Sequence, residues 1–165
     1  TAPPDFFVSD AVHLQEEVAM KGASSGAGPE EVVLAAQGGE EAPVLAWVDG
    51  GGRVDATFEG LFMRGPVSGV TLLMIAMAYG HAGLAEALLW RGADVAVWTS
   101  DGDTALTFAA ANGREKLVEL ALRHGAEINQ RDLTTGCTAL MEAVAFGHER
   151  IVDTLIRHGA EIDMQ

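Results

Sequence analysis

Apolar positions in this chain recur in stripes of four, and the spacing within each stripe predicts a helix. Residues 115–124 carry the stripe Leu117, Val118, Ala121 and Leu122. An i, i+1, i+4, i+5 spacing places such side chains on one face of a helix, where they can pack against a neighbour. The stripe recurs three times, as Pro43, Val44, Trp47 and Val48, as Leu84, Ala85, Leu88 and Leu89, and as Ile151, Val152, Leu155 and Ile156. Four helices of this kind are therefore predicted.

Glycines separate the stripes and keep the same spacing throughout. Gly69, Gly102 and Gly136 each stand two residues before a threonine, with intervals of 33 and 34 residues. Two further series share these intervals: Gly80, Gly113 and Gly147, and Gly92, Gly125 and Gly159. Counting back through Gly51 and Gly39 places the start of a fourth unit near Gly28. A period of this length indicates a stack of structural repeats.

Each unit also predicts a shorter helix ahead of the striped one. In the third unit Thr104 is a candidate N-cap, and the helix would end near Gly113, where a residue with positive φ is tolerated. Small residues hold one equivalent position in all four units, as close helix packing requires: Ala35, Ala76, Ala109 and Ala143. Each unit is therefore predicted to be a pair of antiparallel helices.

These units resemble the ankyrin repeat, a 33-residue unit with a β-turn and two antiparallel helices. The last unit carries Gly147-His148 and then Gly159-Ala160-Glu161-Ile162-Asp163, and the units before it carry related motifs. The resemblance covers about residues 28–165 and implies an all-α ankyrin-repeat solenoid with β-turn or hairpin fingers. The proline and histidine of the family's T-P-L-H motif are replaced here, which predicts weaker local stability and the same fold. The replacing residues are Leu72, Ala105, Ala139, Met74, Thr107 and Met141.

Domain boundaries follow from the repeat. Residues 1–27 form an N-terminal segment with a predicted capping helix at about residues 9–21, and residues 28–165 form the ankyrin repeat domain. The repeats span about 28–68, 69–101, 102–135 and 136–165. No polar capping helix follows the last repeat in this sequence. Its outer face is therefore expected to be partly apolar, through truncation there or through a partner packed against it.

The first repeat is longer than the others because of an insertion at about residues 57–66, in its finger. The insertion contains Phe58, Leu61, Phe62 and Met63. Insertions in repeat arrays map to loops on one face, which is often the binding face. Two interpretations stay open: these side chains contact a partner, or they fold back over the first two units.

Composition narrows the class of partner. The 165 residues include 10 Lys+Arg and 24 Asp+Glu, a formal net charge of −14, and residues 1–59 hold 11 of the acidic residues but only 2 basic ones. This balance argues against binding to nucleic acid or to an anionic membrane surface, both of which need clustered basic residues. The densest apolar run, residues 70–78, has about half of the roughly 20 residues that span a bilayer, so direct membrane insertion is not expected.

The number of cysteines indicates the kind of cellular compartment in which the protein is expected. The single cysteine, Cys137, excludes an intrachain disulfide and favours an intracellular, reducing compartment. The cytoplasm is the default expectation. The start at Thr1, rather than at a methionine, keeps an organelle interior open.

Catalytic chemistry finds no support in the sequence. His81 and His148 hold one position in the repeat, and His124 and His158 hold another, which is the distribution of structural residues. Neither pair has the additional ligands of a zinc site, and Cys137 has no evident base beside it for nucleophilic catalysis. No catalytic residue, metal site or cofactor is predicted, and the chain is not expected to be an enzyme.

Partner binding has more support. The resemblance implies that a partner meets the fingers and the inner, shorter helices. Candidates on the inner helices stand just before the mid-unit glycines: Tyr79, Asn112 and Phe146. Candidates in the finger between the second and third units are Trp98, Asp101 and Asp103. Large aromatic side chains are typical of interface hot spots. The alternative is that Trp98 and Tyr79 pack within the scaffold.

These observations predict a non-catalytic protein–protein interaction module. Its acidic surface favours a partner with a basic or mixed apolar and basic surface. Two alternatives stay open. One is a peripheral subunit held permanently in a larger complex, for example in an organelle, and the other is a regulatory ankyrin segment of a longer enzyme.

Overall fold

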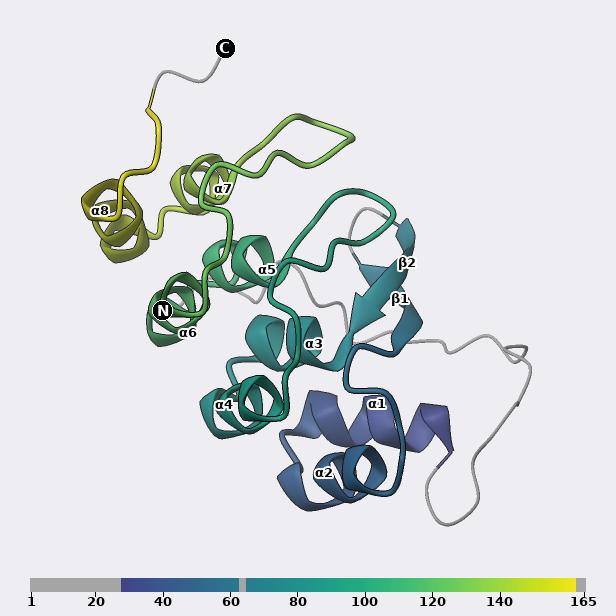
Figure 1. Cartoon of the computed structure of the whole chain (residues 1–165). Helices are drawn as coiled ribbons and strands as arrows, with labels where there is room; N and C mark the ends of the chain where they lie inside the picture. Colours follow the sequence, from purple (N-terminus) through teal and green to yellow (C-terminus); the bar gives the residue numbers. More distant parts are fainter. Residues whose placement is uncertain (1–27, 63–64, 163–165) are drawn as a thin grey trace.

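The computed structural model describes residues 28–62 and 65–162, in which eight α-helices stack as four antiparallel pairs (Figure 1). The inner helices, next to the fingers, are α1 (Pro29–Gly38), α3 (Leu72–Tyr79), α5 (Ala105–Ala111) and α7 (Ala139–Ala145). The outer helices are α2 (Glu41–Asp49), α4 (Ala82–Trp90), α6 (Glu115–Arg123) and α8 (Glu149–Arg157). The predicted all-α solenoid is confirmed. The predicted capping helix at residues 9–21 lies outside the described residues.

Three inner helices begin at a threonine cap. The hydroxyl oxygens of Thr71, Thr104 and Thr138 each accept a hydrogen bond from the backbone N–H three residues on. In α5 the cap is reciprocal, because the Thr107 hydroxyl also accepts from the backbone N–H of Thr104 at 2.7 Å. Thr107 therefore closes a capping box at the position where the family motif has histidine.

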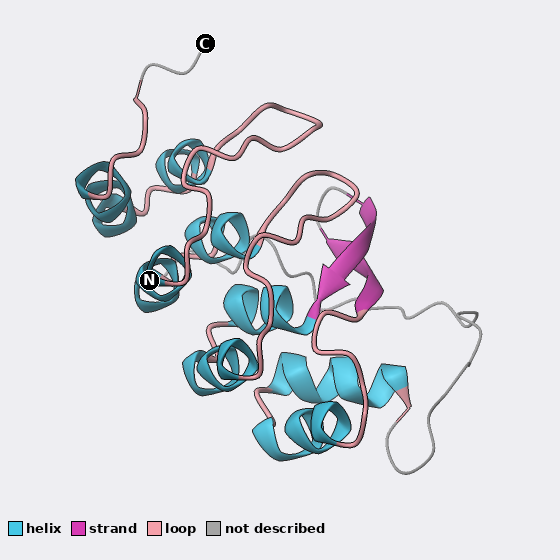
Figure 2. Ribbon diagram, viewed as in Figure 1, coloured by secondary structure: helices cyan, strands magenta, loops and turns pink. Residues whose placement is uncertain are grey.

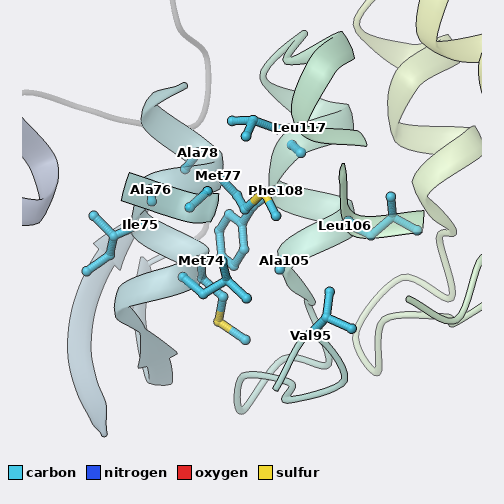
Figure 3. Close-up of a cluster of buried hydrophobic side chains, with 14 of the residues drawn as sticks. Met74, Ile75, Ala76, Met77, Ala78, Val95, Ala105, Leu106, Phe108 and Leu117 are labelled. Atoms are coloured by element: carbon cyan, nitrogen blue, oxygen red, sulfur yellow. The ribbon is translucent and has the colours of Figure 1, made fainter. Parts of the chain in front are cut away.

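The core lies between the helix rows. Every residue of α3 from Leu72 to Ala78 is buried, because α3 packs against both neighbouring inner helices and against α4. Phe108 of α5 points toward Met74 and Met77 of α3 (Figure 3). The alanines at the shared small-residue position are 0–8% exposed, as the expected close packing requires: Ala35, Ala76, Ala109 and Ala143.

The insertion in the first repeat forms an antiparallel β-hairpin of β1 (Thr57–Phe62) and β2 (Gly65–Thr71), drawn in magenta in Figure 2. Its base packs into the array: the Phe58 and Trp47 ring centroids are 6.3 Å apart, and Val70 is 2% exposed. The base of the hairpin thus packs against the array, as one of the two interpretations of the insertion expects. Leu61 and Phe62 lie in β1, but their side chains, like all of Met63, lie outside the described residues.

The fingers stack on one another along the array. The first finger is the hairpin, and the second and third are residues 93–104 and 126–138 (Figure 1). The backbone N–H of Ser100 donates to the Ser68 carbonyl at 2.8 Å, and that of Leu133 donates to the Asp101 carbonyl at 2.7 Å. Each finger is therefore hydrogen bonded to the one before it.

A second series of hydrogen bonds crosses between repeats at the far ends of the inner helices. The side chains of His81, Arg114 and His148, called the bridging side chains below, each donate to a backbone carbonyl of the preceding repeat. The acceptors are the carbonyls of Gln37 at 2.7 Å, Ala78 at 3.2 Å and Ala111 at 2.9 Å, respectively. His81 and His148 thus link neighbouring repeats.

Candidate partner-binding surface

The inner helices place three predicted residues in one row at their C-terminal ends. Tyr79 and Phe146 are half-buried. The Tyr79 ring stacks on His81 with centroids 6.2 Å apart, and the Phe146 ring stacks on His148 at 6.4 Å. Each bridging histidine therefore holds an aromatic ring in place at the edge of the array.

Asn112, the middle residue of this row, is only 8% exposed. Its side-chain nitrogen Nδ2 donates to the Phe108 carbonyl at 2.9 Å, within its own helix. Its oxygen Oδ1 is buried and accepts no hydrogen bond from the described residues. Asn112 therefore offers a partner little surface, and its Oδ1 is an unused acceptor between the two aromatic positions.

The second finger presents Trp98 most prominently. Trp98 is 59% exposed and forms a β-bridge with Thr104 at the base of the finger. Asp101 is half-buried, with its carboxylate accepting from the Ser100 hydroxyl at 3.2 Å. Asp103 is 7% exposed, and its backbone carbonyl accepts from the N–H of Thr99. Trp98 and Asp101 thus offer surface to a partner, while Asp103 closes the finger.

The predicted residues form two separate rows. Trp98 and the aspartates lie in the second finger, beside the N-terminal end of α5, whereas Tyr79, Asn112 and Phe146 lie at the C-terminal ends of the inner helices. An inner helix of seven or eight residues separates the rows by about 10–12 Å at 1.5 Å per residue. The rows border the inner-helix face of the array from its two sides.

The two most exposed of the large apolar side chains in the described residues were not named by the sequence reasoning. Leu133, in the third finger, is 73% exposed, and Trp90, at the end of α4, is 86% exposed. The sequence does distinguish Trp90, because the equivalent position in the other repeats holds a charged residue: Asp49, Arg123 and Arg157.

One group of side chains has the spacing of metal ligands. The ligand atoms of Asp132, Cys137 and Glu142 lie within 4.8 Å of one another. The Asp132 carboxylate, however, already accepts hydrogen bonds from the backbone N–H groups of Thr134, Thr135 and Cys137 and from both threonine hydroxyls. Burial raises the pKa of Asp132, but the bonds from Thr135 and Thr134 outweigh it and hold that pKa well below its usual range. Through these hydrogen bonds, the Asp132 carboxylate stabilises the conformation of the third finger.

Stacked helix pairs with a row of fingers define a helical repeat protein with an elongated surface. The chain belongs to the ankyrin repeat family: a family model described as ankyrin repeats, in three copies, matches residues 73–165. None of the helices in residues 28–62 and 65–162 combines the length and hydropathy needed to cross a bilayer.

A curated relative has the same repeat. The chain is 43% identical over 67 residues to the human ankyrin repeat and KH domain-containing protein 1 (Homo sapiens). The match covers 39% of this chain and 3% of that protein, so the chain spans a small fraction of the relative's length. Ankyrin repeats generally mediate protein–protein interaction, and that is the coarse function that membership of the family supports.

Proposed function

We propose that this chain binds a protein partner across its inner-helix face, between the second and third fingers and the C-terminal ends of α3, α5 and α7. The observation that carries the proposal is the exposure of Trp98, at 59%, on a finger that its neighbours hold in place. A large aromatic side chain on a fixed backbone loses little entropy on binding and buries much area. Leu133, 73% exposed on the next finger, extends the apolar contact area.

The opposite border of this face supports the same proposal. Tyr79 and Phe146 are half-buried, and their rings stack on the bridging histidines. Asn112 between them is buried, so the two rings are the side chains that this border offers for apolar contact with a partner.

Charge favours a partner with a basic or mixed apolar and basic surface. The chain carries a net charge of −14, and Glu59, Asp94 and Asp101 stand in or beside the fingers. Such a surface attracts a basic protein and repels nucleic acid and anionic lipid. We propose no catalytic role for the described residues. With a single cysteine, we also propose an intracellular, reducing compartment.

Two exposed tryptophans provide a matched test. A photo-crosslinking amino acid is placed at Trp98 or at Trp90 of the full chain, which is then exposed to lysate from its source cells. We expect a stoichiometric protein adduct from position 98 but not from position 90, which lies at the end of an outer helix. With the captured protein purified, Trp98→Ala weakens binding by about 2 kcal/mol, roughly thirtyfold, and Trp90→Ala leaves it unchanged. Equal effects at both positions contradict the proposed face.

A second candidate, a peripheral subunit held permanently in a larger assembly, is favoured by the exposed apolar side chains at the last helix pair, among them Val144. Purification of the tagged chain with a high-salt wash separates the two candidates. A single stoichiometric complex that survives the wash supports the subunit, and an enzyme within that complex supports a regulatory segment. Partners that wash off support the transient binding module.

A further inference from the structure

We propose that residues 1–27 of the chain cover part of its own inner-helix face, over α3 and α5, with Phe6 and Phe7 as the apolar anchors. Residues 1–27 lie outside the described part of the chain, and the inference stands on the burial of described residues in α3 and α5. A partner that binds this face has to displace the segment. That consequence alone rests on the proposed function.

The two central inner helices are buried on every side. The residues of α3 from Leu72 to Ala78 are 0–3% exposed, and those of α5 from Ala105 to Ala111 are 0–4% exposed. The seven residues of α5 complete almost two helical turns, so they point in all directions around the axis. The helices that pack against α5 are α3, α7 and α6. These neighbours leave the side of α5 opposite α6, on the inner-helix face, to be covered by another part of the chain.

Ala111 marks this side of α5. It is 4% exposed, yet it does not belong to the hydrophobic core that joins the other buried apolar residues of the described chain. Asn112, the next residue, is 8% exposed. The hydrophobic core therefore does not account for the burial at this end of α5.

The bridging side chains do not account for this burial either. His148 donates to the Ala111 carbonyl, and His81 donates in the same way to the carbonyl of Gln37, at the same position of the first repeat. Gln37 nevertheless keeps part of its surface exposed, and Gly38 after it is exposed. A further segment therefore covers the inner-helix face at α5.

This segment belongs to the chain itself, because the exposed fractions above are those of a single chain. The β-hairpin projects on the finger side of the array (Figure 1), whereas Ala111 ends α5 on the other side. Residues 163–165 span only about 10 Å when extended, too little to reach α5 from the last repeat. Residues 1–27 are left for this role.

The length of the chain allows this placement. Residues 9–27 connect Val8 to Gly28, at the start of α1. Since α1 packs on α3 and α3 on α5, α5 lies two helix spacings from α1, about 16–20 Å. An extended chain as long as residues 9–27 spans about 60 Å, and even a continuous helix would span about 28 Å.

Phe6 and Phe7 are the only aromatic residues in residues 1–27. An aromatic side chain buries about 150–250 Å², and the small side chains of Ala78 and Ala111 leave room for a ring against the helices. Charge does not hold the segment in place, since residues 1–27 hold four acidic residues and one basic residue beside an array that is itself acidic. Apolar contact therefore provides the binding energy, and a basic partner has an electrostatic advantage over the segment.

Cysteine labelling tests the cover. The native thiol is removed by Cys137→Ser, and a single cysteine is introduced by Ala111→Cys or, as the matched control, by Ala110→Cys, at a position that is 0% exposed within the hydrophobic core. Each chain carries either the natural segment or the double change Phe6→Ser and Phe7→Ser. We expect the double change to raise the maleimide labelling rate at position 111 at least tenfold and to leave the rate at position 110 unchanged, because only position 111 depends on the segment for its burial.

Three labelling results would overturn the proposal. The first is a rate at position 111 that is the same with and without the two phenylalanines. The second is an equal increase at position 110, since this would mean that the whole array has loosened. The third is slower labelling at higher chain concentration, which would identify a second copy as the cover. The labelling uses no partner, so none of these results bears on the proposed function.

A photo-crosslinking amino acid in place of Phe7, in the otherwise unchanged chain, provides a second measurement. We expect an intramolecular crosslink that mass spectrometry maps to residues 74–79 or 105–112. A crosslink to α1 or α2 instead would place the segment at the first repeat and contradict the proposal.

Discussion

At the scale of single residues, each bridging side chain depends on the glycine of the preceding repeat. The His148 ring approaches Gly113, where a methyl group would lie 2.8 Å from the ring carbon Cε1. Gly113 also has φ of 71°, which is left-handed backbone that glycine adopts without strain. Glycine is therefore required here for two independent reasons. Its place at the end of a predicted helix indicates the left-handed backbone, but only the structure shows the ring contact.

We expect Gly113→Ala to destabilise the array by about 2–3 kcal/mol. Backbone strain contributes about 1 kcal/mol, and displacement of His148 from the Ala111 carbonyl adds the rest. Gly125→Ala is the matched control, because Gly125 has φ of 85° but no described neighbour within 4 Å of the added methyl. Urea unfolding of both variants measures the difference. Equal losses would show that the ring contact contributes nothing.

Asp132 illustrates what the sequence could not show at this scale. Nothing in the local sequence indicates that this carboxylate is buried, but the structure leaves it 4% exposed, with its oxygens accepting from Thr134, Thr135 and Cys137. Asn112 and Asp103 are similar, since their burial depends on packing that no local pattern encodes. The sequence leaves two arrangements open for Trp98, contact with a partner or packing within the scaffold, and its exposure of 59% is seen only in the structure.

Asp132→Asn should lower the free energy of unfolding at pH 7 by about 2 kcal/mol, since the amide keeps only part of this network. The folded-state pKa of Asp132 lies below its unfolded value of about 3.9, so its contribution is complete above that value and is lost as the pH falls toward the folded-state pKa. Urea titrations from pH 7 to 2.5 should show the two proteins converging below about pH 4. A difference in the free energy of unfolding that stays the same at every pH would mean that the charge of Asp132 does not contribute to stability.

At the scale of elements, a side-chain hydrogen bond links neighbouring repeats at two junctions on the outer side of the array and is missing at the junction between them. The Asp55 carboxylate accepts from the backbone N–H of Asp94 at 2.8 Å, and the Asn129 side chain accepts from that of Glu161 at 3.0 Å. Between these two junctions, the equivalent residue is Ala96, which has no acceptor in its side chain. The second and third repeats therefore lack this link.

Ion pairs also link outer helices of neighbouring repeats. Arg91 at the end of α4 pairs with Asp49 of α2 through two hydrogen bonds of 2.8 and 2.9 Å. Arg150 of α8 lies 3.8 Å from Glu115 of α6. These two pairs join the first repeat to the second and the third repeat to the fourth.

Ala96→Asn should raise the stability of the array by about 0.5–1 kcal/mol, because the new side chain can accept from the backbone N–H of Glu127. Ala96 is exposed, so the change buries no polar group elsewhere. Asn129→Ala, which removes the equivalent link between the third and fourth repeats, is the reciprocal control and should cost a similar amount. Urea midpoints measure both changes. An Ala96→Asn variant no more stable than the parent would show that the link is geometrically inaccessible at this junction.

Helices and the hairpin differ in how far the sequence predicts them. The striped helix predicted at residues 115–124 is observed as α6, Glu115–Arg123, because its spacing and its flanking glycines agree. The sequence predicts the hairpin only as an insertion in the finger. Its alternation is interrupted by a register shift between Phe58 and Gly60, so no continuous two-residue period identifies β1.

At the scale of the whole molecule, the net charge of −14 should govern how fast a partner arrives. We expect the association rate with the captured partner to fall about tenfold between 50 and 300 mM NaCl, with a smaller change in the dissociation rate. Surface plasmon resonance over this range measures both rates. The double variant Glu59→Gln and Asp101→Asn should flatten the dependence. A rate that rises with salt would indicate that apolar contact alone drives encounter.

The missing side-chain link at Ala96 also has a consequence for the shape of the array. At the junction of the second and third repeats, Phe108 packs against α3 on the inner side, while on the outer side the Ala96 side chain has no acceptor for the backbone N–H of Glu127. We expect bending of the array to be easiest at this junction, with its pivot at the inner row. Bending there would widen or narrow the inner-helix face, which would let it fit partners of different breadth.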